Sequence, residues 1–300
     1  MSANAKRIGY IGLGAMGGAM ARNLLKADFP VHVFDADVNR IESVRQLGAI
    51  GETSPAQVAA HSDIVFSSLP GSNEVIDVYL GERGVIEGAR AGLIAVDMST
   101  VPPTVALQIA ESLEGIDVGF LDAPVARTRE AAIAGTLAIM VGGPESVFSE
   151  ACPILNIMGS TIVHVGENGA GQVAKLLNNA ILMSNIVTAC EALLVGARAG
   201  VDVTKLVEVL SEGSADSFAL RNHVARSILP REFAENRFPL DYALKDFEYF
   251  FDLCRDTGAV CMQMSAAREL FHAAKNQGHS KEYFPIVAEI VELLGGGRIS

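Results

Sequence analysis

The sequence has no tryptophan, and only 6% of its residues are aromatic. This composition argues against the aromatic platforms on which carbohydrate-binding proteins stack their ligands. Charged residues are also scarce, at 19% of the chain against roughly 25% in an average soluble domain. The deficit indicates that much surface is buried between elements or between subunits. Half of the residues are hydrophobic, which excludes an intrinsically disordered chain.

Positive charge is in deficit as well. The chain has 23 basic and 35 acidic residues, a formal net charge of −12 at pH 7. Such a balance repels phosphate backbones, so we expect no nucleic-acid partner. It also repels anionic small molecules, so an acidic substrate would need locally placed positive side chains.

Metal-binding patterns are missing from the sequence. The histidines are scattered and no cysteine pair has metal-ligand spacing, so the sequence predicts no metal-binding residue. We expect reduced thiols in a cytoplasmic protein, since the segment 1–6 is too short and polar for a signal peptide. The four cysteines are Cys152, Cys190, Cys254 and Cys261.

One apolar stretch, residues 176–195, has the length of a membrane span. It carries Asn178, Asn179, Asn185 and Glu191, which are costly in lipid. We therefore expect a long helix buried in protein, at the core of a second domain and at a subunit interface, and no membrane partner.

Short apolar runs alternate with helical patterns over residues 1–166, and strands stop afterwards. Apolar runs of this kind are typical of a mostly parallel sheet with helices on both faces. The sequence predicts an α/β domain over 1–166 and an all-α domain over 167–300. The expected strands are 8–11, 31–34, 64–66, 93–96, 119–121, 137–141 and 162–165; the expected helices of the first domain are 16–26, 40–47, 74–80, 103–113 and 145–155.

The helices expected in the second domain begin with the long apolar one, from about 171 to 199. Gly200 can end that helix, and Asp202 can cap the next, which runs to Leu210. Further helices are expected over 217–228, 240–256, 262–276 and 281–294.

The glycines Gly12, Gly14 and Gly17 follow the first strand directly and open a helix. In this pattern the first glycine permits a tight turn, the second lets a pyrophosphate approach the backbone, and the third lets helix and strand pack closely. The helix N-terminus then offers N–H groups and a positive dipole to the phosphates. The first domain is therefore predicted to be a Rossmann-type domain that binds a dinucleotide through residues 12–17, namely Gly12, Leu13, Gly14, Ala15, Met16 and Gly17.

Asp35 ends the second predicted strand. A carboxylate there accepts hydrogen bonds from the adenosine ribose and repels a 2′-phosphate, which favours NAD over NADP. Arg40 is close enough in sequence to reach a 2′-phosphate, so NADP stays open as an alternative.

Taken together, the motifs resemble the β-hydroxyacid dehydrogenase family, which includes 3-hydroxyisobutyrate dehydrogenases and tartronate semialdehyde reductases. The opening segment 11–25 resembles the family's signature, and further matches follow in order along nearly the whole chain. These are Leu69-Pro70, residues 97–100, 122–125, 135–137, 140–143 and 169–175, Asn178-Asn179 and residues 244–246.

Lys175 and Asn179 are four residues apart and share a face of the long helix, together with Asn178. Burial lowers the pKa of a lysine toward the working range of a general acid or base. The resemblance implies that Lys175 is catalytic and that the asparagine one turn later holds the substrate. From spacing alone, a lysine that reaches solvent beside structural asparagines is an equal alternative.

The resemblance also implies roles in the loops and in the last domain. Lys245 is expected to hold the cofactor, and Asp246 to lie near the substrate. Cofactor-lining loops are expected after the third and fourth strands, where ligands bind in such sheets. Their residues are Leu69, Pro70 and Thr100, with Asn73 and Glu74 as further candidates.

The segment Ala126-Arg127-Thr128 departs from the family. Most members have Ser-Gly-Gly there and hold the substrate carboxylate with it. An Arg-Thr pair resembles the sulfolactaldehyde reductase branch, where the arginine binds a sulfonate, but that branch has a serine where this chain has Leu182. We expect Arg127 and Thr128 to bind the anionic end of a substrate; a surface pair with Glu130 is the alternative.

These observations predict an NAD-dependent oxidoreductase that interconverts a small anionic β-hydroxy acid, or a hydroxy sulfonate, and its semialdehyde. The alternatives are a tartronate or succinic semialdehyde-type reductase that uses NADPH, an imine reductase, and a non-enzymatic NAD-binding module. Imine reductases and non-catalytic relatives typically lack the lysine that this chain keeps at position 175. A homodimer or homotetramer is expected, with the two domains closing over the substrate.

Overall fold

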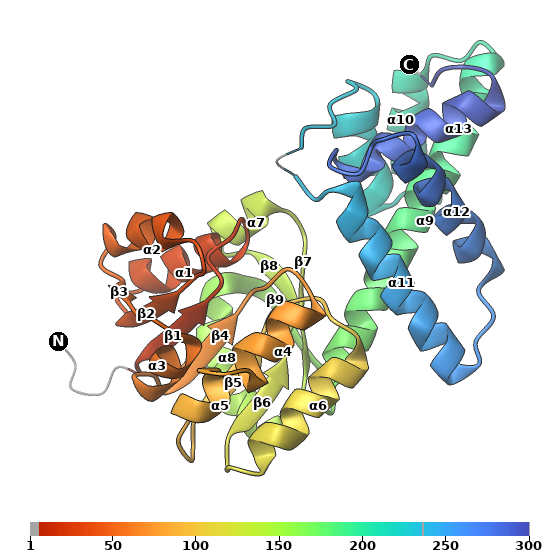
Figure 1. Cartoon of the computed structure of the whole chain (residues 1–300). Coiled ribbons are helices and arrows are strands. Elements are labelled where there is room, and N and C mark those ends of the chain that lie inside the picture. Colours follow the sequence, from red (N-terminus) through yellow and green to blue (C-terminus); the bar gives the residue numbers. More distant parts are fainter. Residues whose placement is uncertain (1–5, 236, 300) are drawn as a thin grey trace. The chain divides into compact units, whose positions relative to one another are not determined.

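The computed structural model describes residues 6–235 and 237–299, and the chain divides into two compact units (Figure 1). Unit 1 comprises residues 1–175 and unit 2 residues 176–300. The division lies inside helix α9 (Ala170–Arg198), nine residues (175 − 166) after the predicted boundary at Gly166. The first turn of α9 belongs to unit 1 because its backbone and side chains are hydrogen-bonded there.

Unit 1 is built on one sheet. Within the described residues its strand order is β3–β2–β1–β4–β5–β6–β8–β7, and β9 pairs with β8. The strands β1 to β6 are parallel, whereas β8 is antiparallel to β6 and β7. The strands are β1 Ile8–Ile11, β2 Val31–Phe34, β3 Ile50–Gly51, β4 Ile64–Ser67, β5 Ile94–Asp97, β6 Gly119–Asp122, β7 Val125–Ala126, β8 Leu137–Gly142 and β9 Gly159–Gly166.

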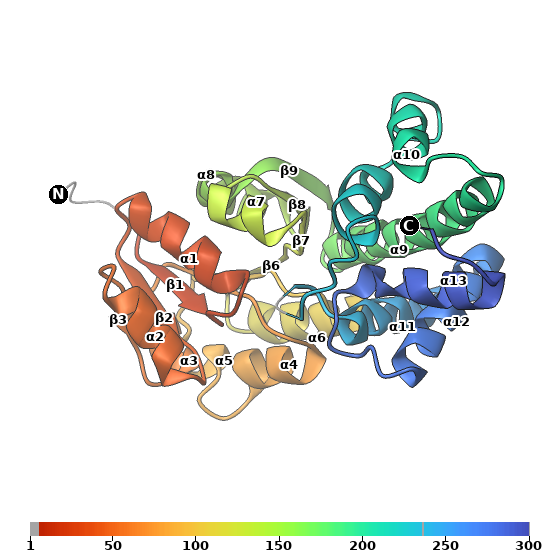
Figure 2. The ribbon, with the colours of Figure 1, turned by 90° about the horizontal axis from the view of Figure 1, so that it is seen from above.

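Helices cover both faces of this sheet (Figure 2). On one face, α1, α7 and α8 pack on the strands through residues such as Met20 and Leu155. On the other face, α3 to α6 pack through residues such as Tyr79 and Ile109. The helices are α1 Gly17–Lys26, α2 Val38–Arg45, α3 Pro55–Ala60, α4 Ser72–Leu80, α5 Val85–Gly88, α6 Pro103–Glu114, α7 Arg129–Ala134 and α8 Glu145–Met158.

This strand order reverses its direction of growth between β1 and β4. Ligands bind at such a switch point, outside the carboxyl ends of the strands. The predicted α/β fold and the predicted Rossmann-type sheet are confirmed. The sequence prediction missed β3, β7, α3, α5 and α7, because segments of two to six residues are too short to show a hydrophobic period.

Unit 2 is all-helical, as predicted, and α9 lies at its centre. The buried side chains of α9 include Met183, Ile186 and Leu193, which pack in the same core as Phe247 and Phe271. The other elements are α10 Val203–Glu212, the π-helix η1 Ala219–Ile228, α11 Leu240–Thr257, α12 Met262–Asn276, the 3₁₀ turn η2 Phe284–Val287 and α13 Ala288–Gly295.

Most predicted helices of unit 2 are confirmed, including the Asp202 cap, whose carboxylate accepts the backbone N–H groups of Thr204 and Lys205. The prediction over 281–294 was wrong at its start. Tyr283 is extended and Pro285 lies in a 3₁₀ turn, so the α-helix begins only at Ala288. Proline has no N–H to donate, which keeps regular α-helical bonding from starting before it.

Among the described residues, α9 is the helix that is long and apolar enough to cross a membrane, by length and composition alone. In this structure 44% of its most apolar window is buried. Helices that are apolar on all sides are typical of protein cores as well as of bilayers. Packing in the unit 2 core therefore accounts for much of the apolar composition of α9.

Candidate active site

The glycine loop between β1 and α1 is shaped by three glycines with different surroundings. A Cβ atom on Gly12 would lie 2.3 Å from the Ser68 carbonyl oxygen, and one on Gly17 would lie 2.0 Å from the Gly12 oxygen. Gly12 also has a φ of +86°, which disfavours other residues. Gly14 differs, because its Cβ would approach only Arg40 Nη1, at 3.8 Å. The space beside Gly14 is therefore open for a ligand such as a pyrophosphate.

Asp35 lies at the end of β2 and braces this loop. Its carboxylate accepts the backbone N–H of Leu13 at 2.6 Å and that of Asp37 at 2.8 Å. Arg40 Nη1 lies 3.6 Å from the same carboxylate. An ionised carboxylate has about four acceptor sites, so Asp35 retains acceptors for ribose hydroxyls. Its predicted role in choosing the cofactor stays a prediction.

Asp97, which ends β5, organises the neighbouring loops although it was not predicted as a site residue. Its side chain accepts hydrogen bonds from Ser67 Oγ at 2.7 Å and from Ser99 Oγ at 2.6 Å. Ser99 Oγ in turn accepts the backbone N–H of Leu69 at 2.9 Å. This buried chain of hydrogen bonds positions the loops that carry Leu69 and Thr100.

The other predicted loop residues lie on the surface near these strand ends. Pro70 is exposed, and Asn73 and Glu74 are exposed in the first turn of α4. Their side chains are accessible to a bound molecule.

Asp122 fixes the start of α9 in unit 1. Its two carboxylate oxygens accept the backbone N–H groups of Gly169 at 2.7 Å and Gln172 at 2.9 Å. The Gln172 side chain donates to the Ser99 carbonyl at 2.9 Å and accepts from Val101 N at 3.1 Å. Burial raises the pKa of Asp122 to about 6, although the two backbone donors oppose the shift. Lys175 follows Gln172 by one helical turn and is thereby held at a defined place.

Lys175 is buried, with 9% of its surface exposed, and it shares its helical face with Asn179. Asn179 Nδ2 donates to Asp246 Oδ2 at 2.6 Å, and Asn178 Nδ2 donates to Asn179 Oδ1 at 3.0 Å. Lys245 Nζ lies 3.4 Å from the other oxygen of Asp246. Four of the five site residues predicted in the last domain thus form one bonded group on α9 and α11, and the fifth, Lys175, lies on α9.

Arg127 occupies a backbone conformation that suits glycine, with a φ of +86°. Its guanidinium donates to the Thr136 carbonyl at 2.5 Å, to Ser160 Oγ at 3.0 Å and to Thr161 Oγ1 at 3.2 Å. Thr128 directly precedes α7. The side chain of Arg127 therefore holds the β8–β9 edge in this structure. Its role toward a substrate remains a prediction, in which the N–H groups of the guanidinium that are not used in these three bonds would donate to the anion.

Hydrogen bonds and one ion pair join several of the predicted residues into two groups. One group, in unit 1, links the glycine loop to Asp35; the loops at Leu69 and Thr100 are braced separately through Asp97. The other links Asn178, Asn179, Asp246 and Lys245, on the helix that also carries Lys175. Sequence reasoning missed Asp97, Ser99 and Gln172. The available signal was a polar residue at the end of an otherwise apolar buried strand, as at Asp97 and Asp122.

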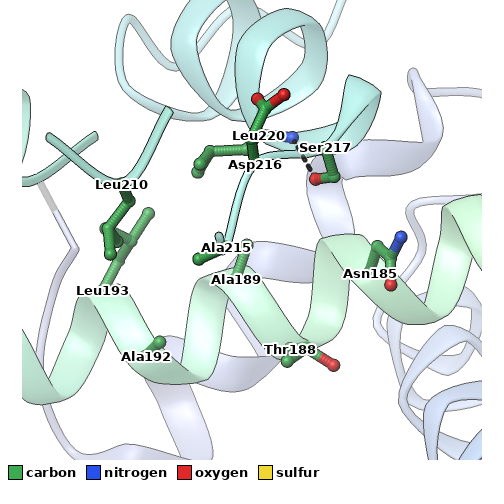
Figure 3. A pocket seen from close by; sticks show the side chains of 10 residues that line it. All are labelled: Asn185, Thr188, Ala189, Ala192, Leu193, Leu210, Ala215, Asp216, Ser217 and Leu220. Carbon is green, nitrogen blue, oxygen red and sulfur yellow. Dashed lines mark hydrogen bonds between the residues drawn. The ribbon is translucent and has the colours of Figure 1, made fainter. Parts of the chain in front are cut away.

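A separate groove lies in unit 2 between α9 and the segment from α10 to η1 (Figure 3). Its lining is mostly alanine and leucine with short polar side chains, and Ser217 Oγ accepts the backbone N–H of Leu220 at 3.1 Å. No predicted site residue lines it. The lining residues are Asn185, Thr188, Ala189, Ala192, Leu193, Leu210, Ala215, Asp216, Ser217 and Leu220.

Comparison with known families covers both halves of the chain. The model of the NAD binding domain of 6-phosphogluconate dehydrogenase matches residues 7–166. A second family model, described as the NAD-binding of NADP-dependent 3-hydroxyisobutyrate dehydrogenase, matches residues 169–290. The chain therefore carries the domains with which these enzymes bind NAD or NADP.

Individual relatives match over nearly their whole length. The chain is 36% identical to 2-(hydroxymethyl)glutarate dehydrogenase of Eubacterium barkeri, over 98% of this chain and 97% of that protein. It is 31% identical to mitochondrial 3-hydroxyisobutyrate dehydrogenase of Mus musculus, over 93% and 85%.

A solved structure, 3-hydroxyisobutyrate dehydrogenase of Mycobacterium tuberculosis with L-serine, superposes with a TM-score of 0.87 at 29% identity, covering 95% of this chain and 99% of that one. The glycine loop, the helix that carries Lys175 and these matches all indicate a dehydrogenase that binds NAD or NADP. The chain belongs to the β-hydroxyacid dehydrogenase family and is an NAD(P)-dependent dehydrogenase that acts on a hydroxy acid or its semialdehyde.

Proposed function

We propose that this dehydrogenase prefers NAD and interconverts a small anionic β-hydroxy acid and its semialdehyde. The observation that carries the proposal is the buried Lys175 on the helical face of Asn179, whose amide is fixed by Asp246. A buried cation beside an oriented amide can bind a carbonyl oxygen and exchange a proton with it.

Lys175 is the proton donor in the direction of reduction. As hydride reaches the carbonyl carbon, the Nζ group gives a proton to the forming alkoxide, and it takes the hydroxyl proton in the reverse direction. A positioned acid or base of this kind contributes about 10²- to 10⁴-fold to the rate. The nicotinamide cofactor, when bound, supplies or accepts the hydride.

The residues of unit 1 fit a dinucleotide. Gly14 leaves open the space that its Cβ would fill, and the adjacent start of α1 offers N–H groups to phosphates. The predicted holders are the loop 12–17, Asp35, Leu69, Pro70, Asn73, Glu74 and Thr100, with Lys245 from α11.

The choice of NAD rests on the carboxylate of Asp35, which repels a 2′-phosphate. Arg40 favours the alternative cofactor, NADP, because its guanidinium is 53% exposed and lies beside the glycine loop. In this structure that guanidinium is within 3.6 Å of Asp35 and 3.5 Å of Asp37. The two carboxylates compete with a phosphate for Arg40, which supports NAD.

An anionic substrate is supported by the relatives and by local charge. The two relatives named above act on 3-hydroxyisobutyrate and 2-(hydroxymethyl)glutarate, which share a primary alcohol one carbon away from the carbon that bears a carboxylate. We propose that Asn178 and Asn179 hold this end of the substrate and that Arg127 and Thr128 contribute to it. A sulfonate is the second candidate, because Arg127 offers a planar pair of donors to a tetrahedral anion.

The test is the decay of NADH absorbance with a panel of aldehydes. The panel contains the semialdehydes of 3-hydroxyisobutyrate, 2-(hydroxymethyl)glutarate, tartronate and succinate, a sulfonated three-carbon aldehyde, an uncharged aldehyde and a cyclic imine, each with NADH and NADPH. The proposal expects the highest kcat/KM for one anionic semialdehyde with NADH. Preference for the imine, or for the uncharged aldehyde, would overturn it.

Arg127→Ala sharpens the assignment of the anionic end. We expect the KM for the preferred anionic substrate to rise by about tenfold or more, since a hydrogen bond to a charged group contributes about 1.5–3 kcal/mol. The uncharged aldehyde should be unaffected. Equal changes for both substrates would assign Arg127 to the β8–β9 edge alone.

Self-association is the remaining part of the proposal. Leu177, Ile181 and Val195 lie on α9 and are exposed in the single chain, by 43%, 50% and 70%. A second copy covering this apolar stripe would remove it from water. Light scattering on the purified chain should give the mass of a dimer or tetramer, and a monomer at micromolar concentration would contradict the proposal.

A further inference from the structure

Three side chains outside the proposed active site converge at one end of unit 1. His32 is on β2, Glu52 follows β3 directly, and His61 ends α3. Each imidazole places Nδ1 at 2.8 Å from the same oxygen, Oε1 of Glu52. The three potential ligand atoms all lie within 4.8 Å of one another.

The backbone fixes where these side chains start. His32 is paired on both sides, with Gly9 of β1 and Ile50 of β3. Glu52 donates its N–H to the Val33 carbonyl at 2.8 Å. The N–H of His61 donates to the Gln57 carbonyl at 3.2 Å, which closes the last turn of α3. The cluster therefore joins three elements whose backbones are already held in place.

The charge of this cluster is unbalanced. The Glu52 side chain is only 10% exposed, and its ion pairs among the described residues are with His32 and His61. When both imidazoles are neutral, a largely buried carboxylate is left without a cation, which is unfavourable. A bound divalent cation would balance it.

The chemistry of the three ligand atoms indicates which metal ion would bind. Two imidazole nitrogens and one carboxylate oxygen are ligands that zinc prefers. Zinc binds such atoms at about 2.0–2.2 Å in a tetrahedron, so neighbouring ligand atoms lie about 3.3 Å apart. The 2.8 Å separations in the structure need to open by only a few tenths of an ångström.

Other histidine–carboxylate pairs in the described part of the chain are different. His272 pairs with Glu248, which also contacts Arg268, and His164 pairs with Glu145. Each brings one imidazole to its carboxylate. Within the described residues, the cluster of His32, Glu52 and His61 differs from these pairs in three ways. It combines two imidazoles, it is partly buried, and no lysine or arginine neutralises its carboxylate.

We propose that His32, Glu52 and His61 form a structural site for one divalent transition-metal ion, with Zn²⁺ as the fitting ion. On binding, each neutral imidazole coordinates the metal through Nδ1 as the tautomer that carries its proton on Nε2, and the Glu52 carboxylate turns from the imidazoles to the metal. Water completes the coordination on the side of His61, whose side chain is 52% exposed. The ion ties α3 to the β2–β3 edge, and the site does not depend on the proposed substrate.

The test uses the full chain after removal of metal with a chelator. Co²⁺ is added as a spectroscopic probe, Zn²⁺ is used to displace it, and the thermal midpoint is measured with and without Zn²⁺. The proposal expects one tightly bound ion per chain, ligand-field absorption in the visible range, displacement by Zn²⁺, and a higher midpoint with Zn²⁺.

The variants separate this site from surface binding. His61→Ala removes a half-exposed ligand without a buried cavity, and Glu52→Gln keeps the shape of the side chain. Both should weaken binding by at least about tenfold and remove the effect of Zn²⁺ on the midpoint. His272→Ala is the matched control and should bind as the parent does. Absence of saturable binding, or equal binding by all variants, would overturn the proposal.

Discussion

The two units bury their polar groups in different ways. Unit 1 places carboxylates at the ends of adjacent strands, as at Asp35, Asp97 and Asp122, and each accepts several hydrogen bonds from neighbouring loops. Unit 2 surrounds α9 with apolar and aromatic side chains, and its buried polar groups form small separate sets, as at His223 with Tyr283, at Glu292 with Arg231, and around Asn179 and Asp246. Parallel strands end at a common edge with unpaired backbone groups, so unit 1 needs such acceptors and unit 2 does not.

A buried group in each unit makes stability depend on pH, and the two dependences have opposite signs. Burial raises the pKa of Asp122 to about 6 and lowers that of His223 to about 4. Asp122 thus stabilises the fold at low pH, and this contribution is lost as pH rises through 6. His223 contributes stability above its unfolded pKa of about 6.5, and this is lost as pH falls toward 4.

The largest expected effect comes from Lys175→Ala. If Lys175 on α9 acts as the acid and base while unit 1 binds the cofactor, kcat should fall by about 10²- to 10⁴-fold. A fluorescence titration with NADH should give an unchanged Kd. Lys205→Ala, on exposed α10, is the control and should keep full activity. A Lys175 variant with near-native kcat would refute the catalytic role.

The second prediction concerns acid and unit 2. His223 is buried, with Nδ1 2.8 Å from Tyr283 Oη and Nε2 without a hydrogen-bond partner among the described residues. The parent should lose about 3 kcal/mol of unfolding free energy through this group between pH 6.5 and 4. His223→Gln should show a flatter pH dependence in urea denaturation, and His272→Gln, at an exposed site, should not. Parallel curves for the His223 variant and the parent would contradict the assignment.

A pair of glycine variants tests the difference between fold and binding within unit 1. Gly17→Ala forces a Cβ to 2.0 Å from the Gly12 oxygen, so urea denaturation should show a loss of about 1–3 kcal/mol. Gly14→Ala meets no such contact and should keep its stability, but it fills the space proposed for the pyrophosphate. Its Kd for NADH should rise about 10- to 100-fold. Unchanged NADH affinity would remove Gly14 from the cofactor site.

The smallest effect is expected for Asp35→Ala. Loss of the carboxylate removes acceptors for the ribose and frees Arg40, so the ratio of kcat/KM for NADH over NADPH should fall by about tenfold. The variant also loses two bonds to backbone N–H groups, so the ratio of the two cofactors, rather than activity alone, is the measurement. An unchanged ratio would exclude Asp35 from cofactor choice.

Much of the fold could be predicted because its signals are local. The continuous apolar strands, the glycines at positions 12, 14 and 17, and the Asp202 cap each act within a few residues. The face shared by Lys175 and Asn179 follows from helical spacing alone. Short elements such as β3 and α7 could not be found in this way, since each contains fewer than two full periods of its own hydrophobic pattern.

Tertiary structure decided which distant residues meet. The sequence by itself determined a parallel α/β unit, a helical unit and a lysine on a polar face of an apolar helix. It did not determine that Asp122 would hold Gln172, that the Arg127 guanidinium would bond to Ser160, or that His32 and His61 would share Glu52. Such contacts depend on strand order and register, which bring together segments that no local period connects.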